Sequence, residues 1–93
     1  MCPSDSNLFQ CPCCDYFTLD ERGIWDICRV CFWEDGDTDL DRPDERSGCN
    51  NGLTLRQARE NFRQLGACEP KMLEHVCAVR ERGRYRHEPR TTG

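Results

Sequence analysis

The pattern of hydrophobic and polar positions is most regular between residues 53 and 66. Apolar residues recur there at the three- and four-residue spacing of one helical face: Leu55, Ala58, Phe62 and Leu65. Thr54 and Gln57 match a capping box, and Gly66 stands where a glycine commonly ends a helix. The pattern therefore predicts an amphipathic α-helix over residues 53–66.

The following segment, residues 70–82, has a similar pattern. Pro70 suits the first turn of a helix. Four apolar side chains then follow on one side: Met72, Leu73, Val76 and Cys77. We expect a second helix over residues 70–82 that ends near Gly83. Residues 83–93 contain few apolar positions, so we expect them to form a flexible, arginine-rich tail.

Nearer the N-terminus, short β-prone runs alternate with pairs of cysteines. Residues 16–19 and 24–27 are rich in aromatic and β-branched side chains. The turn between them, residues 20–23, ends in a glycine that can adopt a positive φ. This order predicts a β-hairpin with one Cys-x-x-Cys pair at each base, in a ribbon that covers residues 10–34.

Residues 35–52 connect this ribbon to the first predicted helix. Their glycines, proline and many acids predict an irregular acidic loop. A chain of 93 residues buries only about 60 to 65% of the surface that its unfolded form exposes, so its core alone is marginal. The elements together predict one small, metal-stabilised α+β domain over residues 8–79, a zinc ribbon extended by one or two helices.

The chain contains nine cysteines, and four of them have the spacing of a metal site. Two Cys-x-x-Cys pairs, separated by thirteen residues, supply these four thiolates: Cys11, Cys14, Cys28 and Cys31. Zn²⁺ prefers a tetrahedron of such ligands. The odd number of cysteines and the lack of a secretory signal favour metal-bound thiolates over disulfides, and a cytoplasmic location. We expect one structural Zn²⁺.

A closed shell of four thiolates leaves no position for water or substrate, so the sequence predicts a binding module and not an enzyme. His75 and His87 lie in no paired motif and are interpreted as surface residues. Cys13 is either a small buried side chain or a spare ligand, and three further cysteines are interpreted as buried or free thiols: Cys49, Cys68 and Cys77. Loss of zinc on oxidation would make the protein a redox sensor, which is a further alternative.

Four stretches together resemble the bacterial cysteine-rich CPCC family over roughly residues 10–68: CPCC at 11–14, DICRVCFWED at 26–35, NGLTLRQARENF at 51–62 and GAC at 66–68. The resemblance implies a small zinc ribbon with the same four ligands. It also implies a shared framework: Phe32, Trp33, Asn51, Gly52 and Phe62. Asp15 stands where the family has a glycine, and Arg29 where its second pair has a proline. The resemblance implies a fold and leaves the biochemical role open.

Charge divides the chain into two halves of opposite sign. Residues 1–50 hold twelve acids and four bases, whereas residues 51–93 hold five acids and nine bases. An acidic loop beside aromatic side chains suits a basic protein partner, as in an immunity protein or an adaptor. We predict this partner surface at Trp33, Asp35, Asp37, Asp39 and Asp41. The alternative for Trp33 is packing in the core against Phe62.

The predicted helix also carries a stripe of arginines, Arg56, Arg59 and Arg63. Together with the arginines of the tail, the stripe would suit the phosphates of a nucleic acid, although a pI of about 5.1 is low for such a domain. Ion pairing of the stripe with the acidic loop is the other interpretation. No stretch approaches the roughly 20 apolar residues of a membrane span, so no membrane partner is expected.

Overall fold

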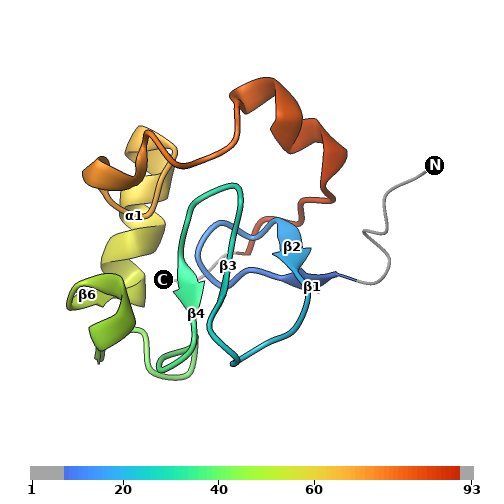
Figure 1. Cartoon of the computed structure of the whole chain (residues 1–93). Helices are drawn as coiled ribbons and strands as arrows, with labels where there is room; N and C mark the ends of the chain where they lie inside the picture. The colour runs from blue at the N-terminus through green and yellow to red at the C-terminus, as the bar shows by residue number, and fades with distance from the viewer. Residues whose placement is uncertain (1–7, 91–93) are drawn as a thin grey trace.

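The computed structural model describes residues 8–90 (Figure 1). Its elements in chain order are β1 (Phe9–Gln10), β2 (Phe17–Leu19), β3 (Asp26–Ile27), β4 (Glu34–Asp35), β5 (Arg46–Ser47), η2 (Gly48–Asn50), β6 (Leu53–Thr54), α1 (Leu55–Leu65), η3 (Pro70–Met72) and η4 (Val79–Arg84). The η elements are short 3₁₀ helices. In the part of the chain that is described, the strands pair as three antiparallel hairpins: β1 with β2, β3 with β4, and β5 with β6. The fold is a small α+β arrangement of short elements.

The two cysteine pairs lie in two different hairpins. The single hairpin predicted across residues 16–27 is wrong, because β2 pairs with β1 and β3 pairs with β4. Each Cys-x-x-Cys segment reverses the chain onto itself. The Cys11 N–H donates to the Tyr16 carbonyl (2.8 Å), and the Cys28 N–H donates to the Trp33 carbonyl (3.0 Å). The cysteine turns therefore join the paired strands, and residues 20–25 only connect one hairpin to the other.

The first helix forms as its sequence predicts. Thr54 caps it: the Gln57 N–H donates to the Thr54 Oγ1 (3.1 Å), and the Thr54 N–H donates to the Gln57 Oε1 (3.0 Å). Gly66 ends it with φ 90°, a conformation that glycine adopts without a Cβ clash. Leu55 and Ala58 are buried on its inner face. α1 stands on one side of the cysteine turns, and the segment that carries η4 lies on another (Figure 1).

A continuous helix over residues 70–82 does not form. The segment contains the short helices η3 and η4, and the residue between them that caps η4, Ala78, is extended (φ −62°, ψ 149°). The Cys77 N–H donates to the Arg29 carbonyl (2.9 Å) and is thereby unavailable to a helix. Leu73, which helical spacing assigned to an apolar face, is 45% exposed. A backbone bond to the second cysteine turn thus replaces the helical hydrogen bonds.

The C-terminal segment also differs from its prediction as a flexible tail. The Phe17 N–H donates to the Arg86 carbonyl (2.8 Å), and the Glu88 N–H donates to the Asp15 carbonyl (3.3 Å). Tyr16 and His87 form an isolated antiparallel bridge between these bonds. Residues 86–90 therefore lie along the first hairpin, whereas residues 91–93 of the predicted tail lie outside the described residues.

Cysteine sulfur makes up much of the core. The largest fully buried apolar side chains are Trp33, Leu19, Leu55 and Val30, and they share one cluster with six cysteines: Cys11, Cys13, Cys14, Cys28, Cys31 and Cys68. Trp33 is fully buried, and Phe62 packs against the same cluster. Within residues 8–90, no helix is both long enough and apolar enough to cross a bilayer. The cluster that is the core is also the candidate site.

Candidate metal centre

Four cysteine sulfurs converge in the middle of the molecule. The Sγ atoms of Cys11, Cys14, Cys28 and Cys31 all lie within 4.8 Å of one another. Cys11 Sγ is 3.7 Å from Cys31 Sγ, and Cys14 Sγ is 3.6 Å from Cys28 Sγ. A tetrahedral metal with metal–sulfur bonds of about 2.3 Å separates its sulfurs by about 3.8 Å. The four thiols are therefore spaced to hold one metal ion.

The backbone of each turn supports its sulfurs in the same way. The Cys13 N–H points at the Sγ of Cys11 (3.4 Å), and the Val30 N–H points at the Sγ of Cys28 (3.3 Å). Amide donors stabilise negative charge on sulfur, so both turns are arranged for thiolates. We call residues 11–15 the first knuckle and residues 28–32 the second knuckle.

The last residue of each knuckle has a positive φ. Asp15 has φ 71° and donates its N–H to the Cys11 carbonyl (3.0 Å), and Phe32 has φ 69° and donates its N–H to the Cys28 carbonyl (2.8 Å). Aspartate tolerates the left-handed region better than most residues, whereas a bulky aromatic is uncommon there. Asp15 thus adopts the conformation for which a glycine would be the unstrained choice.

The four thiols differ in how readily they ionise. Burial raises the pKa of Cys11 and of Cys31 well above the ordinary value of a thiol, and it also raises the pKa of Cys14. For Cys28, hydrogen bonds from the other three thiols and from Thr18 outweigh the burial, and its pKa lies well below the ordinary value. The Thr18 hydroxyl is 2.9 Å from the Cys28 Sγ. Cys28 is thus the thiol of the four that ionises most readily, and a bound dication would stabilise thiolates at all four positions.

The remaining cysteines lie outside this four-sulfur group. Cys13 is 2% exposed and packs in the core, which agrees with its interpretation as a small buried side chain. Cys68 is also buried, and its N–H donates to the Cys31 carbonyl (2.9 Å). Cys49 and Cys77 are partly buried, and burial raises the pKa of both thiols. Cys2 lies outside the described residues.

A buried carboxylate adjoins the first knuckle. Asp15 is 5% exposed, and its carboxylate accepts from Arg59 (Nη1 to Oδ1, 2.7 Å) and from Arg90 (Nη1 to Oδ1, 2.8 Å). Arg59 also donates to the Pro12 carbonyl (2.7 Å). Burial would raise the pKa of Asp15, but hydrogen bonds from the Arg59 guanidinium and the Arg90 backbone N–H, together with the charges of both arginines, hold it below its usual value. Sequence reasoning noted Asp15 only as a departure from the family's glycine and assigned no role to its carboxylate.

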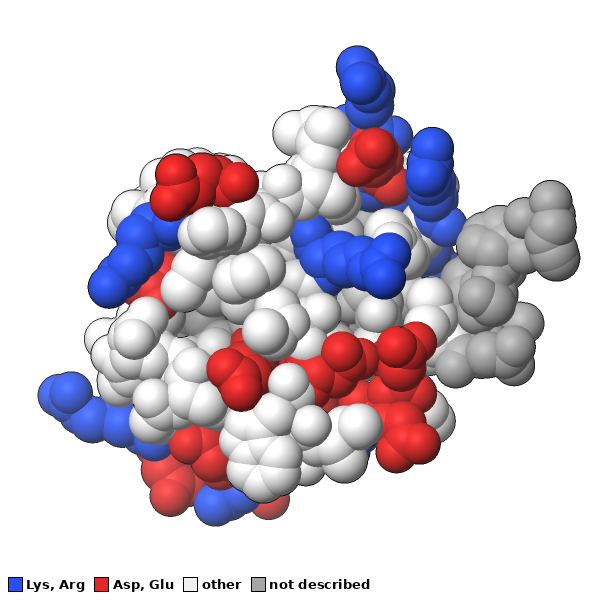
Figure 2. Space-filling view, viewed as in Figure 1, with Lys and Arg blue, Asp and Glu red and all other residues white. Residues whose placement is uncertain are grey.

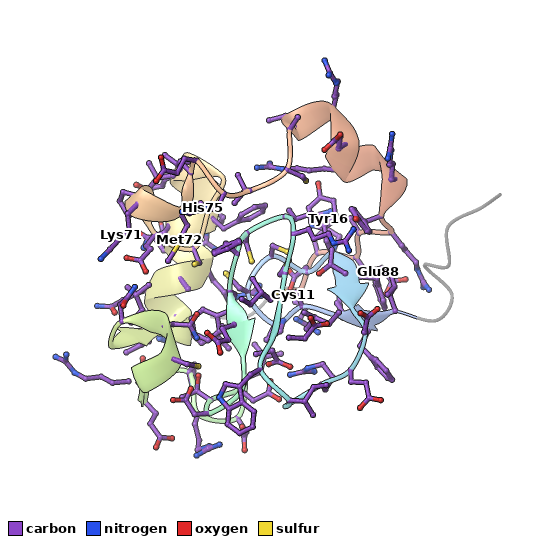
Figure 3. All side chains as sticks on the ribbon, in the orientation of Figure 1. Cys11, Tyr16, Lys71, Met72, His75 and Glu88 are labelled. Carbon is purple, nitrogen blue, oxygen red and sulfur yellow. The ribbon has the colours of Figure 1, made fainter. Side chains whose placement is uncertain are left out.

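Other segments cover both knuckles. Cys11 lies at the centre, with Tyr16 and Glu88 toward one side and Met72 and His75 toward the other (Figure 3). The His87 ring stacks on Tyr16 with centroids 4.1 Å apart, and the His75 ring stacks on Phe32 at 5.1 Å. Neither histidine joins the sulfur group, as the sequence predicts.

The residues predicted as an acidic partner surface do not form one surface. Trp33 is fully buried and Asp35 is 1% exposed, so neither is available to a partner. Asp35 accepts from Arg22 Nε (2.7 Å), and Asp39 accepts from Arg22 Nη2 (2.6 Å). Arg22 thus pairs with two carboxylates of the loop and holds them close to each other.

The other two predicted acids are exposed. Asp37 accepts from the Ser47 hydroxyl (2.6 Å) and from the Gly48 N–H (2.9 Å), which ties the loop to β5. Asp41 stands at the surface with Arg42 Nε 3.9 Å away. Of the four predicted aspartates, Asp37 and Asp41 thus remain exposed.

The arginine stripe of α1 is divided among three intramolecular ion pairs. Arg56 pairs with Asp44 of the acidic loop (2.7 Å), Arg59 pairs with the buried Asp15, and Arg63 pairs with Glu60 on the helix itself. The interpretation that the stripe pairs with the acidic loop thus holds for Arg56 alone. The three guanidiniums do not form a continuous basic track.

A known protein family matches most of the chain. The profile of a family described as cysteine-rich CPCC matches residues 9–83. The match extends past the resemblance over residues 10–68 and includes η3 and most of η4. Searches of curated proteins and of solved structures found no match. Because the family match covers most of the chain, and all four clustered cysteines with it, this protein belongs to the cysteine-rich CPCC family.

Proposed function

We propose that this protein is a zinc ribbon that holds one structural Zn²⁺ through Cys11, Cys14, Cys28 and Cys31, and that it binds a basic protein without catalysing a reaction. The donor set supports zinc, because four thiolates at tetrahedral spacing suit Zn²⁺. Iron also accepts such a site, so metal analysis of purified protein should find close to one zinc per chain and little iron. Bound Zn²⁺ would cross-link the two knuckles, and its closed shell would leave no position for substrate.

The single observation that carries the partner proposal is an exposed apolar group on the segment between the knuckles. Ile24, Trp25 and Ile27 are 54%, 56% and 41% exposed. Exposed apolar patches with polar surroundings commonly mark interaction sites. Trp25 takes the role that the sequence assigned to Trp33, because an indole must be accessible to anchor a partner.

Trp25 is held in an unusual position. It has φ 66°, uncommon for a bulky residue, and its N–H donates to the Asp35 carbonyl (2.9 Å). Its indole lies against Gly36, where an added Cβ would fall 2.4 Å from the ring. Strained residues that the surrounding structure holds in place cluster at functional sites. The glycine and the strained backbone together support an indole presented outward.

Acidic side chains stand beside this apolar group. Asp20 and Glu21 are exposed, and Asp26 and Glu34 are partly exposed on or next to the β3–β4 hairpin. Acids gather across the lower part of the face in Figure 2, around uncharged side chains. Such a surface attracts a basic protein, because complementary charge speeds encounter and sets orientation.

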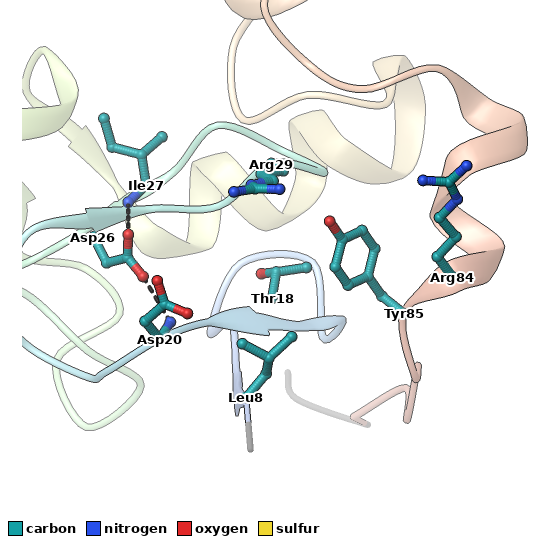
Figure 4. A pocket seen from close by; sticks show the side chains of 8 residues that line it. All are labelled: Leu8, Thr18, Asp20, Asp26, Ile27, Arg29, Arg84 and Tyr85. Atoms are coloured by element: carbon teal, nitrogen blue, oxygen red, sulfur yellow. Dashed lines mark hydrogen bonds between the residues drawn. The ribbon is translucent and has the colours of Figure 1, made fainter. Parts of the chain in front are cut away.

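A hollow of about 320 Å³ opens at the edge of the same surface. Asp20 and Asp26 stand along one side of it, and Arg29, Arg84 and Tyr85 stand along the other (Figure 4). The two walls have opposite charge. A partner segment that carries a basic and an acidic side chain would therefore dock there in one orientation.

The test uses variants that leave the zinc site alone. A partner captured with the zinc-loaded protein would be purified and its affinity measured. Trp25→Ala should weaken binding at least about thirtyfold if the indole is a hot spot. Asp20→Asn with Asp26→Asn should slow association and reduce its salt dependence. Leu65→Ala, which removes another exposed apolar side chain from α1, is the matched control. A partner that is acidic, or that binds Trp25→Ala normally, would refute the proposal.

A further inference from the structure

A second hollow lies on the first knuckle, between it, α1 and the C-terminal segment. Its volume is about 320 Å³, and four arginines line it: Arg59 and Arg63 from α1, Arg82 from η4, and Arg90. We call this hollow the arginine hollow. Its arginines are separated by up to 31 residues in the sequence and come together only in the folded chain. Two of these arginines, Arg59 and Arg63, belong to the predicted stripe, and Arg90 belongs to the predicted tail.

The arginine hollow is cationic in a protein whose net charge is −4. Among its lining residues, Asp15 is the only carboxylate. Four thiolates and one Zn²⁺ would add a net charge of −2 nearby, and the four guanidiniums still outnumber these negative charges. Glu60 pairs with Arg63 from outside the lining and offsets part of its charge. The lining itself still presents four guanidiniums and one carboxylate to an anion.

The guanidiniums are held in place before any ligand arrives. Asp15 fixes Arg59 and Arg90, as described above. Arg82 Nη2 donates to the Gly66 carbonyl (2.9 Å), and its guanidinium carbon stands 5.0 Å from the centre of the Phe62 ring. A preorganised site loses less side-chain entropy when its ligand binds. These contacts leave further N–H groups on each arginine, because a guanidinium has five.

One of those N–H groups lacks an acceptor. Arg82 Nε is buried and has no hydrogen-bond partner within the described residues. A buried donor without an acceptor is costly, and such groups in native structures call for an explanation. An anionic oxygen that reached this N–H would supply the missing acceptor. The arginine hollow thus offers both positive charge and an unsatisfied donor.

We propose that the arginine hollow binds a phosphate group carried by a small, free phosphate compound. A tetrahedral dianion offers several acceptor oxygens to guanidiniums that approach from different directions, and arginine matches phosphate geometry well. The four arginines line one hollow and do not follow a track along the surface. Arg56, the remaining member of the stripe, pairs with Asp44. A single enclosed group of donors suits a single phosphate better than a polymer backbone.

The experiment titrates the zinc-loaded full chain with inorganic phosphate at constant ionic strength, with chloride as the reference anion. Calorimetry gives the affinity, and ¹H–¹⁵N spectra report the Arg82 Nε–H and the amides of residues 13–15. We expect saturable binding to phosphate and none to chloride. Phosphate that causes no saturable change, or the same change as chloride, would overturn the proposal.

Variants locate the site. Arg82→Ala and Arg63→Ala should each weaken phosphate binding about tenfold, the usual cost of a hydrogen bond to a charged group. Arg80→Ala removes the same charge from η4 at an exposed position outside the hollow and is the control. Arg63 is exposed, so its variant tests the proposal even if Arg82→Ala fails to fold. Equal losses of phosphate affinity in all three variants would show that only the net charge of the protein matters, and would refute a specific site in the hollow.

The source of the phosphate is tested separately. Glycerol phosphate should compete with inorganic phosphate, whereas a single-stranded oligonucleotide without terminal phosphates should not. Tighter binding of the oligonucleotide, with a steep dependence on salt, would overturn the assignment to a small compound. Trp25→Ala should leave phosphate binding unchanged, so the outcome is independent of the proposed protein partner.

Discussion

The two knuckles have the same backbone conformation, but different kinds of groups pack against them. In each, the N–H of the third residue points at the sulfur of the first, and the fifth residue has a positive φ close to 70°. The first knuckle is covered by charge, through the Asp15 carboxylate and the guanidiniums of Arg59 and Arg90. The second is covered by the Cys68 and Cys77 amides, which donate to its carbonyls.

This difference distinguishes the backbone conformation that each knuckle requires from the side-chain contacts that can vary between knuckles. The position with positive φ is required by the turn, yet its side chain is free to contact whichever segment covers the knuckle. At the first knuckle Asp15 contacts α1 and the C-terminal segment together. At the second, Phe32 stacks on His75 of the segment after α1. Each side chain thus joins a local turn to a distant part of the chain.

The largest expected effect comes from removing what the knuckles share. Structural zinc contributes on the order of 10 to 16 kcal/mol of apparent binding free energy, more than the net stability of a typical domain. Chelation of the metal, or Cys28→Ser, should therefore abolish the cooperative fold in both knuckles at once. Circular dichroism and metal content measure this. Cys77→Ser, at a partly buried cysteine outside the four-sulfur group, is the control, and a folded metal-free protein would contradict the central inference.

The next largest effect should be confined to the first knuckle. Asp15→Asn keeps a residue that tolerates positive φ but leaves Arg59 and Arg90 without their buried counter-charge. Breaking a buried ion pair in this way commonly costs about 3 kcal/mol or more. We expect a loss of that size in the free energy of unfolding, measured by denaturant titration with zinc bound.

Asp44→Asn is the matched control for Asp15→Asn. Asp44 and Arg56 are also 2.7 Å apart, but both side chains are more than half exposed. Solvent screens such a pair, so we expect no measurable loss of stability. Equal effects at Asp15 and Asp44 would show that burial of the ion pair at the first knuckle does not add to stability.

A smaller effect is expected at the second knuckle. His75→Ala removes a ring that stacks on Phe32 at an interplanar angle of 23°, and such aromatic pairs contribute about 0.5 to 1.5 kcal/mol. The exposed position of His75 favours the lower end of that range. A double-mutant cycle with Phe32→Leu measures the coupling. Hydrogen exchange at the Cys77 amide should rise in His75→Ala, and an unchanged rate would show that the stack does not hold this segment.

Features encoded by neighbouring residues could be predicted from the sequence. The capping box of Thr54 and Gln57 lies within four residues, and the four-sulfur group follows from two short motifs whose ligands must meet at one ion. The sequence therefore predicted α1 and the convergence of the four cysteines.

Features decided by distant contacts could not be predicted. Residues 70–82 have helical spacing, but one hydrogen bond from Cys77 to Arg29 holds the segment outside a helix. The exposure of Trp25 and the burial of Trp33 depend on which strands pair, and the prediction paired the wrong ones. Asp15 looks like an ordinary surface acid until the fold brings Arg90 from 75 residues away. In each case the structure depends on a contact between distant residues, which the sequence around either residue does not reveal.

The smallest expected effect concerns a carboxylate in the acidic loop that follows the second knuckle. Burial would raise the pKa of Asp39, but its hydrogen bond from Arg22 holds the pKa below the ordinary value of 3.8. A group whose folded pKa is depressed contributes stability above its unfolded pKa and loses it as the pH falls through the folded pKa. The pair is partly exposed, so Asp39→Asn should cost less than about 1 kcal/mol at pH 7. Total stability should fall toward pH 5 as protons compete with the metal for the thiolates, yet the difference between wild type and Asp39→Asn should stay constant from pH 8 to pH 5. A difference that shrinks within this range would mean that another titrating group, and not Asp39, responds to Arg22.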